Sequence, residues 1–173
     1  KTTRTNIVKF NLKQEEYIMW LYARLMTKTY KHGGYTSFYV TEPKLRKVEA
    51  SAYIDRVVHR WVVDSFLIDT FVPQFIDTSY ACIKDKGMHR AALAVQNGKK
   101  KCKKKYREKY KLKMDIAKYF ASINKEKLDE IISRKIKDED VLWLLREIIY
   151  SKKDEVGIPI RKFNKSNFCK CLL

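Results

Sequence analysis

The stretch KMDIAKYFASIN, residues 113–124, is the most informative part of the chain. It closes an alternation of apolar and charged side chains, which predicts a strand that ends near Asp115. A turn and an aromatic pair, Tyr119 and Phe120, follow. A carboxylate buried at a strand end costs on the order of several kcal/mol unless a cation or hydrogen-bond donors meet it. Spacing alone leaves two interpretations: Asp115 caps the next turn, or it meets a cation.

Two helices are predicted downstream of this stretch. Asn124 or Ser122 is expected to cap the first, which runs to about Lys135. The second is DEDVLWLLREIIYSK, residues 138–152, with acidic side chains in its first turn, where the helix dipole favours them. The following GIPI, residues 157–160, predicts a turn that enters a new strand.

Upstream, residues 12–31 carry apolar side chains at helical spacing, and Gly33 and Gly34 are expected to close that helix. Short extended segments are expected around Pro43, because proline cannot lie inside a helix. Ser51 is a candidate N-cap for a helix that runs to about Thr70.

The expected apolar faces of these two helices are Leu12, Ile18, Leu21, Tyr22, Leu25 and Met26 in the first, and Val57, Val58, Trp61, Val62, Phe66 and Leu67 in the second. Pro73 marks the exit of the second helix. A loop and strand over 75–83 and a helix over 86–96 complete the pattern. Helices and strands do not alternate regularly, so we expect a helix-rich α+β fold with a small antiparallel sheet.

Composition indicates one globular domain with a polyanionic partner. The 173 residues are 45% hydrophobic and 13% aromatic, which is too rich for a disordered polycation. A net charge of +18 favours nucleic acid over a membrane surface. No apolar run approaches the roughly 20 residues that span a bilayer, and KTTRTNIVKF lacks the apolar core of a signal peptide. The four cysteines match no zinc or disulfide spacing, so we expect a reduced, cytoplasmic protein.

The run KKKCKKKYREKYKLK, residues 99–113, interleaves lysines with tyrosines just before the predicted Asp115 strand. Such runs are usually a solvated face. Here stacking tyrosines accompany the charge, so sequence-independent phosphate contact is the alternative. The candidate nucleic-acid-binding residues of the run are Lys103, Lys104, Lys105, Tyr106 and Arg107.

Four motifs in order resemble the reverse transcriptases of bacterial retroelements: group II intron, retron and diversity-generating retroelement enzymes. These motifs are EPKLRKVEASAYIDRVVHRWV (42–62), FIDTSYACIKDKGMHRAA (75–92), KMDIAKYFASIN (113–124) and GIPI (157–160). The resemblance covers about Phe38 to Ile160. It implies RNA-directed DNA polymerase activity and the fingers and incomplete palm of a right-hand polymerase.

The resemblance also implies residue roles. Asp115 corresponds to the first catalytic aspartate, which binds Mg²⁺ together with the backbone carbonyl of Ile116, because hard Mg²⁺ prefers oxygen ligands. Phe120 corresponds to the aromatic that packs under the deoxyribose and selects dNTPs. Lys44 and Arg46 correspond to the cations that grip the triphosphate.

Arg56 is expected to support the fingers strand or to contact template phosphate. Each of these residues has a structural alternative: Phe120 as core, Lys44 and Arg46 as solvated surface, and Arg56 as a partner of Asp55 or Asp64. Two of the three histidines, His59 and His89, are expected to be packing or surface residues.

The family pattern is incomplete in this sequence. Its palm needs an aromatic-x-Asp-Asp turn beside the first aspartate, and no Asp-Asp pair occurs in the chain. One carboxylate cannot organise two Mg²⁺ ions, so we expect weak Mg²⁺ binding and no polymerisation by this chain alone. The thumb is also absent.

Residues 161–173 depart from the family wording, which is Gly, three variable residues, Ser-Gln or Ser-Pro, and then Ala-Asn. Codons can be chosen for residues 160–173 so that removing one base after the Ile160 codon gives IGNLTSQIFANVY, which restores that wording. We therefore expect an out-of-frame tail, with no selected role for Cys169 and Cys171. The restored wording favours the diversity-generating subclass, which implies a small helical accessory protein as partner.

These readings divide the chain into fingers and first palm elements (1–96), a basic connector (97–113), a partial palm (114–160) and the tail (161–173). The expected partners are an RNA template, a DNA primer, dNTP and a second copy bound through an uncovered palm edge, with no membrane. A non-catalytic basic module that binds RNA or DNA is the alternative function.

Overall fold

The computed structural model describes residues 2–41, 45–81, 83–105, 110–117, 119–152 and 157. Their elements are α1 (Thr2–Leu12), α2 (Gln14–Met26), β1 (Tyr35–Val40), β2 (Arg46–Ser51), α3 (Tyr53–Val62), the π-helix η1 (Val63–Leu67), α4 (Ile68–Phe71), the 3-10 helix η2 (Val72–Gln74), α5 (Met88–Lys105), α6 (Tyr119–Ser122), α7 (Lys125–Lys135) and α8 (Glu139–Ile149). The helix-rich α+β class with a small antiparallel sheet is confirmed.

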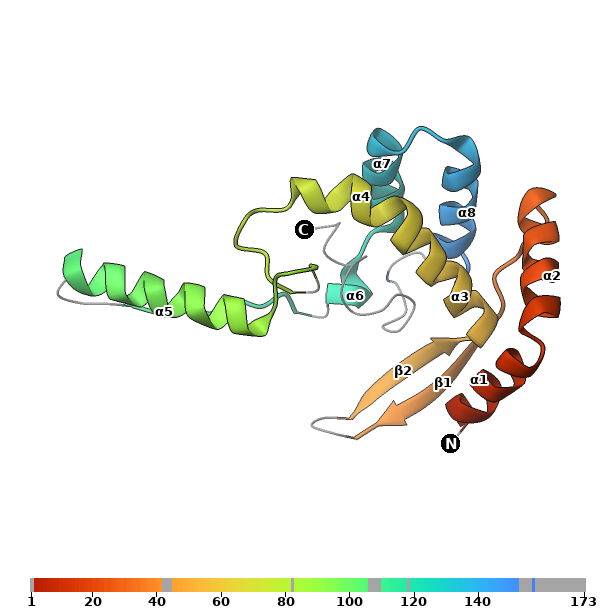
Figure 1. Ribbon diagram of the computed structural model, residues 1–173, viewed down its shortest axis with the longest axis horizontal. Helices are drawn as coiled ribbons and strands as arrows, with labels where there is room; N and C mark the ends of the chain where they lie inside the picture. The colour runs from red at the N-terminus through yellow and green to blue at the C-terminus, as the bar shows by residue number, and fades with distance from the viewer. Residues whose placement is uncertain are drawn as a thin grey trace.

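The core forms where residues 53–74, called here the central helix, pack against α7 and α8 (Figure 1). Val58 and Val62 from α3 are buried together with Leu145 and Ile148 from α8. Helix α8 buries an apolar stripe because its hydrophobic residues recur every three or four positions. The expected helices over 124–135 and 138–152 are confirmed, including the Asn124 cap, whose side chain accepts a hydrogen bond from the Lys127 N–H at 2.9 Å.

A π-helical stretch interrupts the central helix at Val63–Leu67. In a regular α-helix, five residues turn the chain by about 500°, which would rotate Leu67 well away from the face of Val62. The wider π turn returns Leu67 to that face, and both residues are buried in the core. A π turn contains about one residue more than an α turn. This additional residue keeps the apolar side chains on one continuous face along the central helix.

The sheet is the antiparallel hairpin of β1 and β2, in which Tyr35 pairs with Ser51 and Val40 with Arg46 (Figure 1). It confirms the extended segments expected on either side of Pro43. Lys152 at the end of α8 forms an ion pair with Glu49 of β2, at 3.0 Å between Nζ and Oε2. This contact joins the hairpin to the helical layer.

Several expected helix boundaries are wrong. The helix over 12–31 is two helices, and α2 ends at Met26 because Lys28 adopts a left-handed backbone, with φ 53°, well before Gly33. Ser51 is not an N-cap: it ends β2, and Ala52 precedes α3 without a side-chain cap.

Two of the expected apolar faces also differ from the structure. On α2, Leu21 is buried and Leu25 packs against the core, whereas Ile18, Tyr22 and Met26 are exposed. Trp61 is 46% exposed and packs its edge on Phe66 rather than entering the core.

Two expected strands are absent among the described residues. Residues 75–81 and 83 form turns, and residues 110–116 form no strand before the Asp115 turn. A strand is stabilised by a hydrogen-bonded neighbour, and the only described strands, β1 and β2, pair with each other. The alternating pattern at 110–116 therefore finds no partner in the described part of the chain. The expected strand after GIPI lies outside the described residues.

Candidate functional site

The candidate metal and nucleotide residues lie around the turn that follows residue 115. Asp115 and Ile116 have exposed side chains, and Phe120 is half-buried on the short helix α6. The ring of Phe120 meets that of Tyr119 edge-on, with centroids 5.3 Å apart. Asp115 is thus accessible to solvent, which avoids the desolvation cost of a buried carboxylate.

Gly157, the first residue of GIPI, packs on this turn from far along the chain. Its N–H donates to the Ile123 carbonyl at 2.8 Å. Its φ of +93° is one that residues with a side chain rarely adopt, and a Cβ there would lie 3.1 Å from the Ala121 carbonyl oxygen and 3.3 Å from that of Phe120. Glycine is needed at this position for both reasons. Two of the predicted motifs therefore meet in space.

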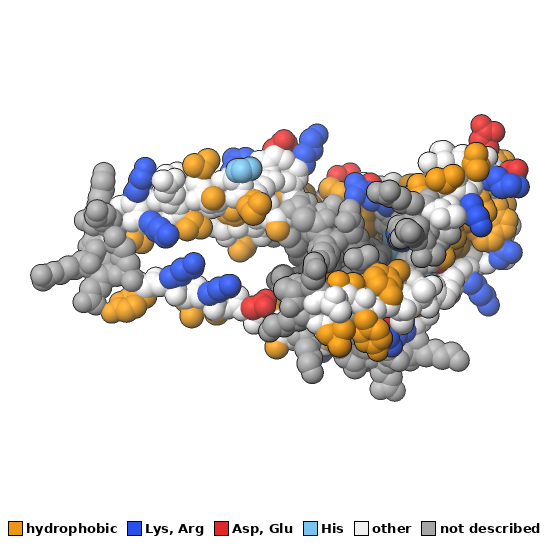
Figure 2. All heavy atoms as spheres, turned by 90° about the horizontal axis from the view of Figure 1, so that it is seen from below, with side chains coloured by type: hydrophobic (Ala, Val, Ile, Leu, Met, Phe, Trp, Pro, Cys, Tyr) orange, Lys and Arg blue, Asp and Glu red, His pale blue; other side chains and the backbone are white. Residues whose placement is uncertain are grey.

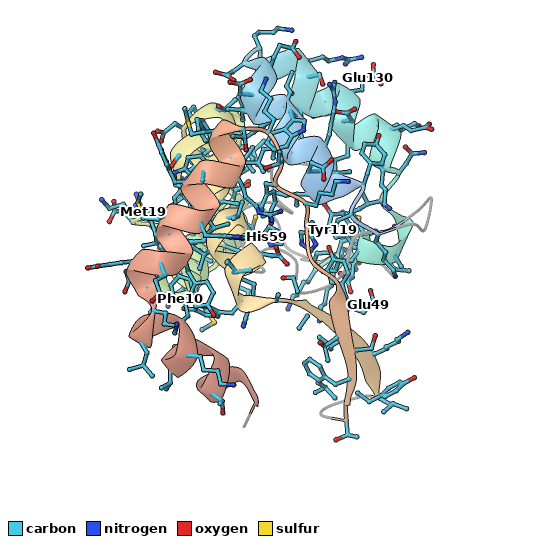
Figure 3. The ribbon with its side chains drawn as sticks, turned by 90° about the vertical axis from the view of Figure 1, so that its right-hand side faces the viewer. Phe10, Met19, Glu49, His59, Tyr119 and Glu130 are labelled. Atoms are coloured by element: carbon cyan, nitrogen blue, oxygen red, sulfur yellow. The ribbon has the colours of Figure 1, made fainter. Side chains whose placement is uncertain are left out.

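The predicted triphosphate-binding cations belong to the β1–β2 hairpin. Lys44 lies in the connection between the strands, outside the described residues. Arg46 begins β2, with its backbone paired to Val40, and its side chain is outside the described set. The hairpin extends from the helical layer beneath α3 (Figure 3).

Arg56 lies on α3 with its guanidinium 5.0 Å from the centre of the Tyr53 ring. Its Nε is buried and has no hydrogen-bond partner among the described residues. The alternative that Arg56 pairs with Asp55 or Asp64 is wrong, because Asp55 accepts from Tyr30 and Asp64 pairs with Arg60. An unmet buried donor costs about 1–3 kcal/mol.

The basic run forms an arm that projects from the helical layer. Helix α5 continues to Lys105, so it crosses the predicted domain boundary at residue 97, and residues 110–117 run back beside it (Figure 1). Figure 2 shows Lys and Arg side chains along both limbs of the arm. Lys99, Lys100 and Lys101 are exposed on α5 and Lys111 and Lys113 on the returning limb. The side chains of Lys103, Lys104 and Lys105, and the whole of Tyr106 and Arg107, lie outside the described residues.

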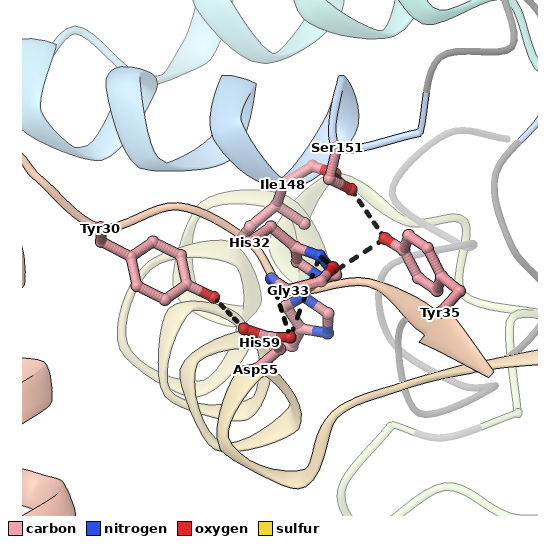
Figure 4. Close-up of polar contacts among 8 residues, drawn as sticks. All are labelled: Tyr30, His32, Gly33, Tyr35, Asp55, His59, Ile148 and Ser151. Atoms are coloured by element: carbon pink, nitrogen blue, oxygen red, sulfur yellow. Dashed lines mark hydrogen bonds and ion pairs between the residues drawn. The ribbon is translucent and has the colours of Figure 1, made fainter.

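A partly buried polar cluster was missed by sequence reasoning. It joins the segment before β1 to α3 and to the end of α8, and it consists of Tyr30, His32, Gly33, Tyr35, Asp55, His59 and Ser151 (Figure 4). Asp55 accepts from the Tyr30 hydroxyl at 2.7 Å and from the Gly33 N–H at 3.1 Å. The Ser151 hydroxyl donates to the Ile148 carbonyl at 2.8 Å. The oxygen of the Tyr35 hydroxyl lies 2.7 Å from the Ser151 Oγ.

Two stacked histidines fill the centre of this cluster. The Nδ1 of His32 donates to the Gly33 carbonyl at 2.6 Å, so the Nε2 of a neutral His32 is an acceptor. The Nε2 of His59 lies 3.1 Å away and is the matching donor. Figure 3 shows His59 inside the molecule, beneath α2, which agrees with the packing role expected for it.

The cluster also affects two tyrosines. Burial, followed by the hydrogen bond to Asp55, raises the pKa of Tyr30 above its ordinary 10.0. Burial likewise raises the pKa of Tyr35. Both hydroxyls therefore stay protonated as donors at neutral pH. The only sequence signal for the cluster was Asp55 one helical turn before His59 on an apolar helix face.

No described residues form a group of three or more His, Cys, Asp or Glu side chains that would hold a metal ion. Within the described ranges, every helix is too short or too polar to cross a bilayer. No protein-family model matches the chain, and no curated protein matches it.

Proposed function

We propose that this chain is the fingers and partial palm of a reverse transcriptase of the bacterial retroelement type. The observation that carries the proposal is the contact between Gly157 and residues 120–123, which joins the GIPI motif to the turn after Asp115. The order of the four motifs supports it further. Phe120, beside the Asp115 turn, is the proposed sugar-packing residue, and the hairpin cations Lys44 and Arg46 are the proposed triphosphate ligands.

The proposed partners are an RNA template and a DNA primer, held mainly through phosphate. The net charge of +18 and the lysines on both limbs of the α5 arm support this binding. Arg56 is a further proposed phosphate ligand, on the family resemblance. The accessory protein is proposed on the same resemblance.

The residues present do not fit a complete two-metal centre. Asp115 and the Ile116 carbonyl offer hard oxygen ligands, but the described residues place no other carboxylate in a metal-holding group with them. The sequence contains no Asp-Asp pair to supply one. No catalytic step is therefore assigned to this chain, and the nucleotidyl transfer belongs to a complete palm.

A non-catalytic nucleic-acid-binding module is the second candidate function. The observation that favours it is the unformed strand at 110–116, because a working palm holds its aspartate on a paired strand. Both candidates predict nucleic-acid binding through the arm, and they differ in whether a complete reading frame has polymerase activity.

Binding through the arm is tested by fluorescence anisotropy with a labelled RNA–DNA primer–template at several salt concentrations. Replacing Lys99, Lys100 and Lys101 by Gln should lower the slope of log K against log salt by about 2–3, since each phosphate contact contributes about 0.9. The matched control replaces exposed Lys9, Lys127 and Lys135 on α1 and α7. Equal slopes for the two triple variants would refute binding through the arm.

The polymerase assignment is tested by reading the gene onward from the Ile160 codon. If removal of one base opens a frame with an aromatic-x-Asp-Asp turn, the protein translated from it should extend a primer on RNA, and Asp115→Asn should abolish extension while leaving primer–template affinity unchanged. Normal extension by the Asn variant would refute the role of Asp115. The absence of such a frame would make the non-catalytic module the better proposal.

A further inference from the structure

Residues 110–116, YKLKMDI, form the returning limb of the arm and alternate strictly between apolar and charged side chains. The apolar members are unusually exposed: Tyr110 90%, Leu112 80%, Met114 81% and Ile116 52%. A period of two places these four side chains on one face of an extended chain and the charged ones on the other. The limb therefore has the sequence pattern of a strand that is buried on one face, but the described residues leave that face exposed.

Nothing in the described chain covers this limb as a neighbouring strand, because β1 and β2 pair only with each other. In Figure 2 the limb stands apart from α5 over much of its length. An extended segment with a row of exposed apolar side chains is suited to pairing with another strand. The remaining question is which strand fits it.

The sequence of the limb is complementary to itself in the antiparallel direction. A two-fold axis through Met114 places Leu112 of one copy opposite Ile116 of the other, and Met114 opposite Met114, on the apolar face. On the other face Lys113 lies opposite Asp115 twice, which gives two cross-strand pairs of opposite charge.

Neighbouring registers are excluded by their charges. A two-fold axis through Leu112 places Lys111 of one copy opposite Lys113 of the other. An axis through Lys113 places the two copies of Lys113 opposite each other, and an axis through Asp115 places the two copies of Asp115 opposite each other. Of these four axes, only the one through Met114 places no like charges directly opposite. Phosphate contacts from Lys111 and Lys113 would leave the apolar row of the limb uncovered.

We propose that residues 110–116 form an antiparallel two-fold β-ribbon with a second copy, centred on Met114, in which residues 112–116 lie opposite the same residues of that copy. Isologous pairing of this kind closes on itself, so the expected product is a dimer. The proposal gives a register to the self-association expected from the family resemblance, but it stands on these seven residues and does not depend on polymerase activity.

The register is tested by disulfide cross-linking in a chain whose four native cysteines, Cys82, Cys102, Cys169 and Cys171, are replaced by Ser. Directly opposed residues in an antiparallel pair have Cα atoms about 4.5–5.5 Å apart, which suits a disulfide. Met114→Cys should therefore form a covalent dimer rapidly under mild oxidation.

Leu112→Cys is the matched control, because the two copies of this residue would lie about 13 Å apart along the ribbon. It should not cross-link to itself, but it should cross-link to Ile116→Cys when the two variants are mixed. Equal cross-linking of the Met114 and Leu112 variants with themselves would overturn the register.

The dimer itself is tested by light scattering over a range of concentrations, after nuclease treatment and in high salt. Mass should rise with concentration, and Met114→Lys should weaken dimerisation by at least about tenfold, because it brings two like charges together at the axis. Met88→Lys, an equally exposed substitution on α5, should leave the dimer unchanged.

A monomer at all concentrations, loss of association after nuclease treatment, or equal weakening by the Met88 substitution would each overturn the proposal. A failure of primer–template binding would leave it intact, so the two proposals fail separately.

Discussion

Gly33 is the described glycine at which an added Cβ would make the shortest contact. A Cβ there would lie 2.8 Å from Oδ2 of Asp55, so one of them has to move by about 0.6 Å to reach the 3.4 Å of an ordinary contact. Asp55 is buried, and its two carboxylate oxygens are held by the Tyr30 hydroxyl and by the N–H of Gly33 itself. The methyl group therefore competes with two hydrogen bonds to a buried charge.

Overpacking of this kind costs about 1–3 kcal/mol, and hydrogen bonds to charged groups fall in a similar range. We expect Gly33→Ala to lower the free energy of unfolding by about 2 kcal/mol, or the Tm by about 4–8 °C for a chain of this size. The assays are urea unfolding followed by circular dichroism and thermal melting.

Gly34→Ala is the matched control, because a Cβ at Gly34 meets nothing within 4 Å. It should change stability by no more than about 0.5 kcal/mol. A double-mutant cycle with Asp55→Ala isolates the clash: in that background Gly33→Ala should cost little, because the carboxylate is gone. Equal effects of the two alanine variants, or an unchanged cost without Asp55, would refute the reasoning.

Three further predictions concern the core, the buried tyrosines and the layer contacts. Leu145→Ala removes a fully buried side chain of α8 and should cost about 2–5 kcal/mol in urea unfolding, whereas Trp61→Ala on the exposed side of α3 should cost clearly less; the reverse order would contradict the core described here. Because the pKa values of Tyr30 and Tyr35 are raised in the folded state, their contribution is complete below pH 10 and declines as the pH rises above it; Tyr30→Phe should flatten this alkaline decline, and an unchanged slope would count against it. Arg146 donates from Nε to both oxygens of Asp129, each at 3.1 Å, so Arg146→Lys should cost about 0.5–1 kcal/mol, and a neutral result in thermal melting would show that this α7–α8 contact is not stabilising.

The elements that local signals specify were predictable from the sequence. Helices α7 and α8 carry capping residues, Asn124 and Asp138, directly before a strong apolar period. The hairpin follows from β-prone residues on either side of Pro43. In each case the physical cause lies within a few residues along the chain, so a pattern is sufficient.

The predictions that failed concern features that depend on residues far apart in the sequence. The alternation at 110–116 is real, but a strand also needs a neighbour, and no local pattern says whether one is present. Gly33 and Gly34 suggested a helix end, whereas Gly33 is needed for its approach to Asp55 on α3. The histidine pair joins His32 to His59 across the fold, and neither residue has a motif of its own.

The candidate site was predicted in part. The contact of Gly157 with residues 120–123 joins two motifs that the sequence singled out, but the roles of Asp115, Phe120, Lys44 and Arg46 stay predictions. The buried Nε of Arg56 was not predictable, because it depends on Asp55 and Asp64 having other partners.

The π-helical stretch at Val63–Leu67 carries a consequence for insertions and deletions. A helix with one extra residue tolerates the loss of that residue, since deletion restores the regular turn and keeps the flanking apolar side chains on one face. Asp64 and Ser65 are the exposed residues of the stretch, and of the two Asp64 pairs with Arg60, so Ser65 is the residue to delete. Loss of its codon should therefore leave a folded chain with an unbroken α-helix, whereas loss of a codon within α8 should displace an entire buried stripe. Thermal melting of the two deletion variants would separate these outcomes.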